Sequence, residues 1–320
     1  MDRRSFLLGG LCTCALGVPA FGQQPSFRRS LPDRASFFAA GLRCGTHSLS
    51  LYEKHRVQRM IAAIVARGIT VMGTIVIPVR FNILHDGDLG RLPQKQIEDQ
   101  LHVMNVGFRP ANIQFTIDDV SFHNRPDWFY MSKFENAQFE AKSALVRDPE
   151  RLLKFYSADI DPQGWATFPV DLAKYPLWDG IVVAYDSFPG GSQKFYDLGM
   201  TAVHEAGHWL GLSHTFEGGC SIIGDAIEDT PAEAEPAYEC PIGRDTCPDW
   251  HDRGPDPIHN YMDYSDDACM NQFTPGQHRM MRILISAYRS ALIEDRALVS
   301  ANSSATISRQ VLIDLRKSIR

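Results

Sequence analysis

The stretch HEAGHWLGLSH, residues 204–214, carries three histidines and a glutamate at a regular spacing. His204 and His208 are four residues apart, so an α-helix places them on one face, one turn above the other. Their imidazole nitrogens can then bind a single metal ion. Glu205 lies beside them, close enough to contact a metal-bound water without being a ligand. The stretch therefore predicts a helix that carries part of a metal site.

The third histidine of the stretch, His214, can join that site only if the helix ends before it. A continuous helix would carry His214 about 15 Å along the axis from His204, out of reach of a shared ion. Gly211 stands between them, and glycine adopts the left-handed conformation that a sharp turn needs. Three protein ligands leave zinc an open position for water, and the ion lowers the pKa of that water to about 7. Glu205 is then placed to take the proton of the water as it attacks a carbonyl, and to hand it to the leaving amine.

Composition places the chain among globular proteins and excludes one class of partner. Its 320 residues are 44% hydrophobic and 22% charged, enough for the core of one large domain or two smaller ones. The net charge of −6 and the isoelectric point of about 6.0 do not provide the basic surface of a nucleic-acid-binding protein. The last residues, RQVLIDLRKSIR (309–320), have the pattern of a short amphipathic helix, for which a membrane or partner role is the less favoured alternative.

The first 22 residues, MDRRSFLLGGLCTCALGVPAFG, have the features of an export signal. Arg3 and Arg4 precede an apolar run that is too short to span a bilayer, and small residues follow it, so cleavage after Ala20 or Gly22 fits. The paired arginines resemble the twin-arginine signals of bacteria, and a simple hydrophobic leader is the alternative. No other segment approaches a transmembrane length, so we predict a secreted or periplasmic protein with no membrane contact beyond export.

The seven cysteines of the chain divide into three groups. Cys12 and Cys14 leave with the signal. An even set follows the histidine stretch, and in an exported protein this predicts two disulfides, for which four cysteines allow three pairings. The members of this set are Cys220, Cys240, Cys247 and Cys269. Cys44 is left over, far upstream, and requires a separate explanation.

Periodicity along the rest of the chain predicts helices and strands before the histidine stretch and few regular elements after it. Residues 23–50 lack clear periodicity and have the character of a pro-segment or linker. The expected helices are residues 51–68, 92–108 and 151–160, and the expected strands are residues 70–84, 112–122, 164–170 and 179–185. These elements favour an upper half of helices and strands and an irregular, cysteine-bearing lower half.

A second set of motifs lies downstream of the histidines, where Met262 stands between Tyr261 and Tyr264. The full HExxHxxGxxH spacing followed by a methionine-containing turn is the signature of the metzincin endopeptidases. The further segments of interest are GWATFP (164–169), GDAIEDTPAE (224–233), CPIGRDTCPD (240–249) and DPIHNYMDYSDDACMNQFTPGQHRMM (256–281). With them the chain resembles the pappalysin family of metzincins, most closely its small secreted microbial members, over residues 164–281 and more weakly from Thr74.

This resemblance implies an α+β fold of the metzincin type. A twisted, mostly parallel sheet with the active-site helix forms the upper half, and an irregular, disulfide-stapled half with a C-terminal helix lies below. We expect residues 1–22 to be the export signal, 23–70 a pro-segment, 71–293 the catalytic domain and 294–320 a C-terminal tail. The implied activity is zinc-dependent hydrolysis of peptide bonds in polypeptides, with the substrate extended along an edge strand formed by GWATFP.

The resemblance also implies a role for each site residue. The implied zinc ligands are His204, His208 and His214. Glu205 is the general base, and Met262 forms an apolar floor beneath the imidazoles, with Met270 as the less favoured candidate. Tyr264 places its phenolic hydroxyl at the zinc or at the oxyanion of the reaction intermediate, for which a packed aromatic side chain is the alternative.

Two features of the lower half follow from the same family. Its crossing cystine pattern would staple a half that has little regular structure. The implied pairs are Cys220–Cys247 and Cys240–Cys269. Family members also bind calcium there, through hard oxygen ligands of the kind that the acidic GDAIEDTP offers. The candidates are Asp225, Glu228 and Asp229, each with a solvated acidic loop as the alternative.

The segment RCGTH, residues 43–47, resembles the cysteine-switch sequences of metzincin pro-segments. A thiolate is a good zinc ligand, so Cys44 can occupy the open position and hold the enzyme latent. Activation then requires cleavage between Cys44 and the strand near Thr74. A free cysteine, or one paired with another molecule, is the alternative.

Two other interpretations and one detail of specificity stay open. The first alternative is a non-catalytic zinc-binding interaction domain. Glu205 argues against it, because a structural zinc site has no use for that carboxylate and normally has a fourth protein ligand. An astacin-like metzincin is disfavoured by the cysteines between the histidines and the methionine turn.

Some relatives with an acid just before the last cysteine of this segment prefer basic residues after the scissile bond. Here that position is Ala268, and the nearby Asp266 and Asp267 are not equivalent to it.

Overall fold

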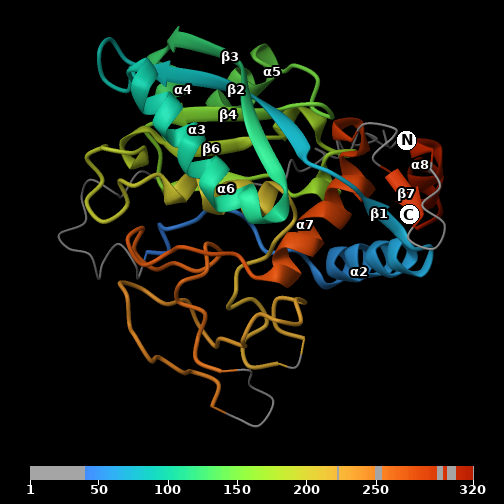
Figure 1. Ribbon diagram of the computed structural model, residues 1–320. Coiled ribbons are helices and arrows are strands. Elements are labelled where there is room, and N and C mark those ends of the chain that lie inside the picture. Colours follow the sequence, from blue (N-terminus) through green and yellow to red (C-terminus); the bar gives the residue numbers. More distant parts are fainter. Residues whose placement is uncertain (1–39, 222, 249–253, 294–297, 301–307, 320) are drawn as a thin grey trace, which may run out of the picture.

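The computed structural model describes residues 40–221, 223–248, 254–293, 298–300 and 308–319 (Figure 1). The predicted export signal and the first part of the predicted pro-segment lie outside these residues. The helices are α2 (Leu51–Ala66), α3 (Gln94–Phe108), α4 (Pro126–Phe129), α5 (Ala137–Ala144), α6 (Met200–Trp209), α7 (Pro275–Tyr288) and α8 (Arg309–Ser318). The strands are β1 (Ile69–Val71), β2 (Ile75–His85), β3 (Ile113–Asn124), β4 (Leu153–Ala158), β5 (Gly164–Ala166), β6 (Ile181–Ala184) and β7 (Leu298–Ser300). None of the described helices has the length and apolar character needed to cross a bilayer.

Among the described residues, five strands form the central sheet, in the order β3-β2-β4-β6-β5. The first four are parallel to one another, and β5 runs antiparallel to β6 at one edge. β2 and β3 pair along the length of β2, with a bulge between Val79 and Arg80. The sheet is twisted and mostly parallel, as the resemblance to metzincins implies (Figure 1).

Helices cover both faces of this sheet (Figure 1). α3 and α6 pack against each other and on one face, in the same core as Phe81, Phe155 and Ile181. α4 and α5 belong to a second core on the other face, which contains Tyr156 and Val182. Neighbouring residues of β4 and of β6 thus enter different cores, because successive side chains of a strand point to opposite faces.

The helix expected over residues 151–160 is wrong, because residues Leu153–Ala158 form β4 in the middle of the sheet. All the residues of this strand are buried. A parallel strand covered on both faces is a near-continuous apolar run, which periodicity alone does not distinguish from a segment of buried helix. Pairing with β2 and β6 decides the outcome.

The single strand expected over residues 70–84 is divided in the structure. β2 begins at Ile75, whereas β1 covers Ile69–Val71 and pairs with the C-terminal β7 in a separate two-stranded sheet. Gly73 lies between them with φ of 72°, which glycine adopts without strain. The amphipathic C-terminal helix is present as α8, which packs on α7 and α2.

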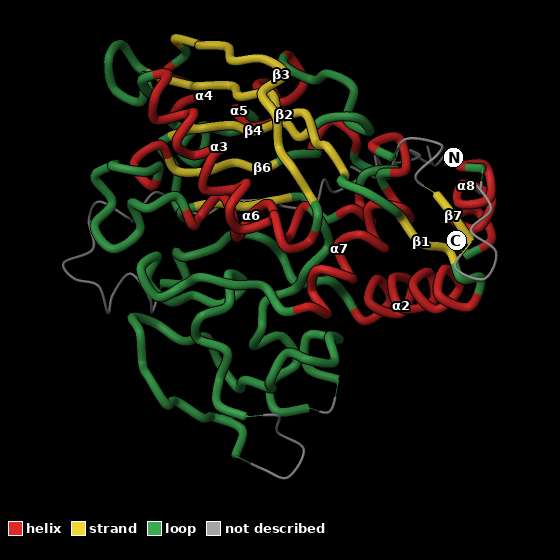
Figure 2. Tube along the Cα trace, in the orientation of Figure 1, coloured by secondary structure: helices red, strands yellow, loops and turns green. Residues whose placement is uncertain are grey.

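The lower half, residues 210–274, contains neither helix nor strand in its described parts (Figure 2). The disulfides that join its loops are Cys220–Cys247 and Cys240–Cys269, with S–S distances of 2.02 and 2.06 Å. These are the pairs that the family resemblance implied. Covalent cross-links therefore take the place of regular hydrogen-bonded elements in this half.

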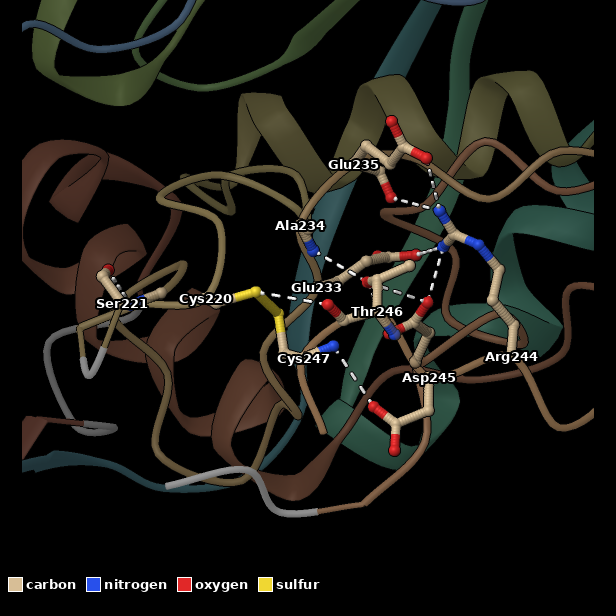
Figure 3. The surroundings of a disulfide bond; sticks show 11 residues. Cys220, Ser221, Glu233, Ala234, Glu235, Arg244, Asp245, Thr246 and Cys247 are labelled. Atoms are coloured by element: carbon tan, nitrogen blue, oxygen red, sulfur yellow. Dashed lines mark hydrogen bonds and ion pairs between the residues drawn. A yellow bond between two sulfur atoms is a disulfide. The ribbon is translucent and has the colours of Figure 1, made fainter. Parts of the chain in front are cut away.

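An ion-pair cluster supports the loops around the first of these disulfides (Figure 3). The guanidinium of Arg244 donates to Glu233 Oε1 at 2.7 Å and to Asp256 Oδ2 at 2.6 Å. Glu233 is wholly buried, and its Oε2 accepts a 2.9 Å hydrogen bond from the hydroxyl of Thr215. Because Thr215 directly follows the third histidine of the predicted metal site, the cluster fixes the segment that leaves that site.

Candidate active site

Helix α6 carries the first two histidines into the interior of the molecule. All its residues from Thr201 to Trp209 are buried, because the helix packs against β5, β6 and α3. The Nε2 atoms of His204 and His208 are 3.1 Å apart. Both rings therefore lie on one face of the helix and point toward a common position.

The turn after α6 brings in the third histidine. Gly211 has φ of 102°, in the region that favours glycine, and a Cβ at this position would lie 2.3 Å from Leu284 Cδ1. Both the backbone and the packing thus select glycine here. Beyond the turn, His214 Nε2 lies 3.0 Å from His208 Nε2. The helix ends where the three-histidine hypothesis requires it to end.

The hydrogen bonds of the first two imidazoles determine which nitrogen carries a proton. His204 Nδ1 lies 2.7 Å from the carbonyl oxygen of Tyr261, and His208 Nδ1 lies 2.7 Å from that of Leu212. A carbonyl only accepts, so each Nδ1 is the protonated nitrogen and each Nε2 presents a lone pair. Burial, and then the neighbouring histidines, hold the pKa of both rings well below the usual value. Lone pairs that face each other at 3.1 Å repel unless a cation lies between them.

This arrangement fits a tetrahedral metal ion. Typical Zn–N bonds place two nitrogens of such a site about 3.3 Å apart, and typical Zn–S bonds place a sulfur about 3.6 Å from each nitrogen. The observed Nε2 separations are 3.0 and 3.1 Å, and Cys44 Sγ lies 3.6 Å from His208 Nε2. The ligand atoms of Cys44 and the three histidines lie within 4.8 Å of one another, and all four residues are buried. The donor set and its dimensions therefore suit zinc.

The residues expected from the methionine turn lie at the same cluster. Met262 is wholly buried, and its sulfur would be only 2.4 Å from a Cβ at Gly207, so it packs on the helix between the two histidines. Tyr264 Oη lies 3.2 Å from His214 Nε2, and the two rings meet edge to face. The hydroxyl of Tyr264 thus points into the cluster.

Glu205 is wholly buried beside the histidines. Its Oε2 accepts a 2.8 Å hydrogen bond from the hydroxyl of Thr46, which belongs to the predicted pro-segment. Burial raises the pKa of this carboxyl to about 7, although Thr46 and Cys44 act in the opposite direction. A Cβ at Gly164 would lie 2.8 Å from Glu205 Cγ, so β5 passes directly over the carboxylate. Thr46 had no role in the sequence-based prediction, which considered only the cysteine of this segment.

Residues 42–46 run along the edge strand β5, which GWATFP was expected to form. The hydrogen bonds are Gln163 N to Leu42 O at 2.9 Å, Gly45 N to Gly164 O at 2.8 Å, and Ala166 N to Thr46 Oγ1 at 2.8 Å. The first two join backbone to backbone, as in strand addition to an open sheet edge, and the third uses the hydroxyl of Thr46. The strand that was expected to bind substrate is thus occupied by an N-terminal segment of the same chain.

The residue before Cys44 enters a buried pocket next to the histidines. Arg43 is wholly buried, and its Nη1 donates to Thr201 Oγ1 at 3.0 Å. Its Nη2 lies 3.8 Å from Asp267 Oδ1, and its Cζ lies 4.9 Å from the ring centre of Tyr196. Burial raises the pKa of Asp267 to about 6, while Arg43 opposes the rise. Neither charged residue was assigned a role from the sequence. The available signals were an arginine directly before the predicted switch cysteine and an aspartate directly before Ala268.

A buried charge cluster anchors the end of α6. Asp179 accepts from Arg289 Nη2 at 2.6 Å and from the indole N–H of Trp209 at 3.2 Å, and Lys154 Nζ lies 3.7 Å away. The guanidinium of Arg289 lies 3.6 Å from the ring centre of Trp209. Burial acts against ionisation of Asp179, but Arg289 and Lys154 hold its pKa below the usual value. These residues come from β4, α6, the loop before β6 and the end of α7, so the cluster ties the sheet to both helices.

The acidic residues suggested for calcium have different surroundings. The carboxylate of Asp229 accepts from Thr274 Oγ1 and from the backbone N–H of Gly276, each at 2.7 Å, and thereby caps the first turn of α7. Asp225 is buried, and burial raises its pKa to about 7. Glu228 is exposed. Within the described residues, neither aspartate belongs to a cluster of three or more carboxylate, thiol or imidazole ligands.

Comparison with known sequences places this chain among metalloproteases. Residues 183–286 match the peptidase family described as pregnancy-associated plasma protein-A. An extracellular metalloprotease of Verticillium alfalfae is 42% identical over 224 residues, which are 68% of this chain and 79% of that protein. An extracellular metalloprotease of Colletotrichum graminicola is 37% identical over 279 residues, which are 82% of this chain and 97% of that protein.

Solved structures show the same relationship. A mutant of promirolysin from Tannerella forsythia superposes with a TM-score of 0.67 at 26% identity, over 78% of this chain and 97% of that one. Mature mirolysin from the same organism, in complex with a cleaved peptide, superposes with a TM-score of 0.58 at 28% identity, over 70% of this chain and 99% of that one. By sequence and by fold, this chain belongs to the pappalysin family of metalloproteases.

Proposed function

We propose that this chain is a secreted zinc endopeptidase that is made as a latent zymogen. One observation carries the proposal: a single short segment reaches the metal-binding nitrogens and the buried glutamate together. Cys44 Sγ lies 3.6 Å from His208 Nε2, and two residues later the hydroxyl of Thr46 lies 2.8 Å from Glu205 Oε2. A segment that contacts both groups at once inhibits a reaction in which both take part.

In the active enzyme the three histidines hold zinc through their Nε2 atoms. When bound, zinc would polarise the scissile carbonyl and make the attacking water more acidic. Glu205 is placed to accept a proton from the attacking water and to return it to the leaving amine. Tyr264 is placed to donate a hydrogen bond to the oxyanion, since its hydroxyl lies at the cluster. The backbone of β5 holds the extended substrate by the hydrogen bonds that residues 42–46 now make.

Latency follows from what the N-terminal segment covers. In this proposal residues 23–70 are the pro-segment, 71–293 the catalytic domain and 294–320 a C-terminal tail. The pro-segment blocks the fourth metal position with Cys44, the general base with Thr46 and the edge strand with its backbone. Cleavage between Cys44 and the start of β2 releases all three together.

The pocket that Arg43 fills supports a preference for basic substrates. When the pro-segment leaves, Asp267 loses the cation that faces it, and an unpaired buried carboxylate is unfavourable. An arginine or lysine of the substrate can replace that cation. Asp267 would then do what an acid at the position of Ala268 does in some relatives. Because Arg43 directly precedes Cys44, we propose that the preferred basic residue is next to the scissile bond.

Localisation and calcium belong to the same proposal. The N-terminal sequence has export features, and the relatives compared above are named extracellular metalloproteases, which supports a secreted or periplasmic enzyme. For calcium, Asp225 is the better candidate, because its Oδ2 is buried without a hydrogen-bond partner among the described residues. Asp229 is less suited, because both its oxygens cap α7.

The proposal is tested by a time course on the precursor without its signal, beside Glu205→Ala. Zinc content is measured first. Chain shortening and casein cleavage are then followed with and without a zinc chelator, and new termini are read by mass spectrometry. We expect the wild type to trim itself past Cys44 and gain chelator-sensitive activity, and Glu205→Ala to stay intact. A wild type that binds zinc but cuts nothing, even after another protease removes the pro-segment, would instead support a non-catalytic zinc-binding domain.

A further inference from the structure

The third imidazole of the site differs from the other two in what its outer nitrogen contacts. His204 and His208 each direct Nδ1 to a backbone carbonyl at 2.7 Å. The Nδ1 of His214 instead faces the carboxylate of Glu217, with Oε2 at 3.8 Å. We infer that Glu217 is a positioning residue for His214, and that Lys54 of the proposed pro-segment holds the same carboxylate in the latent protein. The inference rests on the proposed function, because it concerns a zinc ligand.

A tight turn after His214 places Glu217 behind the ring. The backbone N–H of Glu217 donates to the carbonyl of His214 at 3.1 Å. Between them, Phe216 stacks on the imidazole with centroids 4.8 Å apart and ring planes 11° apart. The stacking fixes the plane of the imidazole, so its Nδ1 has a defined direction. The side chains of His214 and Glu217 are only 7% and 11% exposed, so little water competes for their contact.

A carboxylate behind a metal-binding histidine has a defined chemical effect. The carboxylate accepts a hydrogen bond from Nδ1–H, which leaves the Nε2 lone pair for the metal and makes the imidazole a more basic ligand. His214 depends on such a partner more than the other two ligands do. His204 and His208 are fixed by α6, whereas His214 lies in an irregular segment beyond the turn.

The proposed pro-segment contacts the same carboxylate from the other side. Lys54 Nζ, on α2, lies 3.2 Å from Glu217 Oε1. The other carboxylate oxygen of Glu217, Oε2, is 3.8 Å from the Nδ1 of His214, which is longer than a hydrogen bond. A cavity of about 370 Å³ adjoins the pair and is lined by apolar residues of α2 such as Val57 and Ile61. The carboxylate thus borders open space on the side of Lys54, and in this inference loss of Lys54 lets it close the 3.8 Å gap to His214.

Zinc affinity tests this inference. The full chain without its signal carries Glu205→Ala, so that it stays intact, and Cys44→Ala, so that only the histidines bind the ion. Affinity is measured by competition with a chromophoric chelator, and the visible spectrum of the Co²⁺-loaded protein reports ligand geometry. We expect Glu217→Ala to weaken zinc binding by roughly 10- to 100-fold and to change the Co²⁺ spectrum. Glu217→Gln should lose less zinc affinity, because its amide oxygen still accepts a hydrogen bond from Nδ1–H. Glu140→Gln, on the exposed face of α5, is the matched control and should change nothing.

Lys54→Met in the same background tests the role of the pro-segment. If Lys54 draws the carboxylate away, Lys54→Met strengthens zinc binding by roughly 3-fold or more while Glu217 is present, and has no effect in Glu217→Ala. A strengthening that persists in Glu217→Ala would overturn the part assigned to Lys54.

Two results would overturn the inference about Glu217. The first is a zinc affinity of Glu217→Ala within about two-fold of the background, against the loss expected for an orienting partner. The second is a background protein that binds no zinc, which would overturn the proposed function and this inference with it. Melting temperatures of the zinc-free proteins identify a variant that has lost its fold, and the near-isosteric Glu217→Gln then provides the decisive comparison.

Discussion

Replacing Thr46 with valine separates the two contacts that the proposed pro-segment makes with the active site. The hydroxyl of Thr46 donates to Glu205 Oε2 and accepts from the backbone N–H of Ala166, each at 2.8 Å. Valine has nearly the same shape without the hydroxyl, so Cys44 stays in place while both hydrogen bonds are lost. We expect Thr46→Val to weaken latency although the thiol is intact.

The size of the effect follows from burial. Thr46, Glu205 and Ala166 are 8%, 0% and 2% exposed, so water does not replace the lost hydroxyl while the pro-segment is bound. Burial raises the pKa of Glu205 to about 7, so the carboxyl is ionised above that pH, where a hydrogen bond to a charged group contributes about 1.5–3 kcal/mol. Once the pro-segment opens, water satisfies both partners, so the loss falls on the latent form alone. At 1.4 kcal/mol for each factor of ten, the open fraction rises by roughly 10- to 100-fold.

The assay is the initial rate at which the intact precursor cleaves a quenched fluorescent peptide, with intact mass measured at each time point. Only open molecules accept the peptide, so the initial rate reports the open fraction before any chain is cut. Thr46→Val should exceed the wild type by the factor given above. Thr46→Ser keeps the hydroxyl and should stay near the wild type.

Equal initial rates for Thr46→Val and wild type would refute this reasoning if Cys44→Ser is active in the same assay. The thiol would then hold the protein latent without help, and the hydrogen bond between Thr46 and Glu205 would contribute only to the local structure of the segment.

Three further predictions concern other parts of the molecule. Gly211→Ala places a Cβ 2.3 Å from Leu284 Cδ1 at φ of 102°, so we expect a loss of about 2 kcal/mol or more in the free energy of unfolding, together with loss of zinc. Denaturation curves and metal analysis check this, and a variant with wild-type values of both would contradict it. Asp267→Asn removes the acid that faces Arg43, so kcat/KM should fall roughly 10-fold for peptides with arginine next to the scissile bond and change little for methionine peptides. Equal losses for both peptides would place the determinant elsewhere. Burial lowers the pKa of Lys142 from 10.5 to about 7, so above that pH the unfolded chain binds more protons than the folded one. Stability should therefore rise from about pH 7 toward pH 10, by at most about 1.4 kcal/mol per pH unit, and Lys142→Met should flatten the rise in denaturation curves at several pH values.

Much of the candidate metal site is predictable from local sequence, because its three histidines are close along the chain, although Cys44 reaches them from 164 residues away. His204 and His208 are separated by about one helical turn, Gly211 permits the left-handed conformation, and His214 follows within reach. No distant segment is needed to bring these residues together. The disulfide pairs were also anticipated, although only through the family resemblance, because four cysteines by themselves allow three pairings.

Elements whose identity depends on partners far along the chain were less predictable. The apolar residues of β4 were expected to form a helix, and they form a strand because β2 and β6 provide hydrogen-bonding partners on both sides. The division between β1 and β2 has a similar cause, since β1 pairs with β7, more than two hundred residues away. Local pattern carries no information about such partners.

By itself, then, the sequence determined the family and predicted three histidines as metal ligands, a glutamate beside them and a glycine turn, since these depend on short spacings and on motifs that can be compared directly. Only the tertiary structure decided that Thr46 meets Glu205, that Arg43 meets Asp267 and that Lys54 meets Glu217. The two partners in each of these contacts are more than 150 residues apart. Their meeting depends on where the sheet edge, α6 and the irregular half come together in space, and no spacing in the sequence records that position.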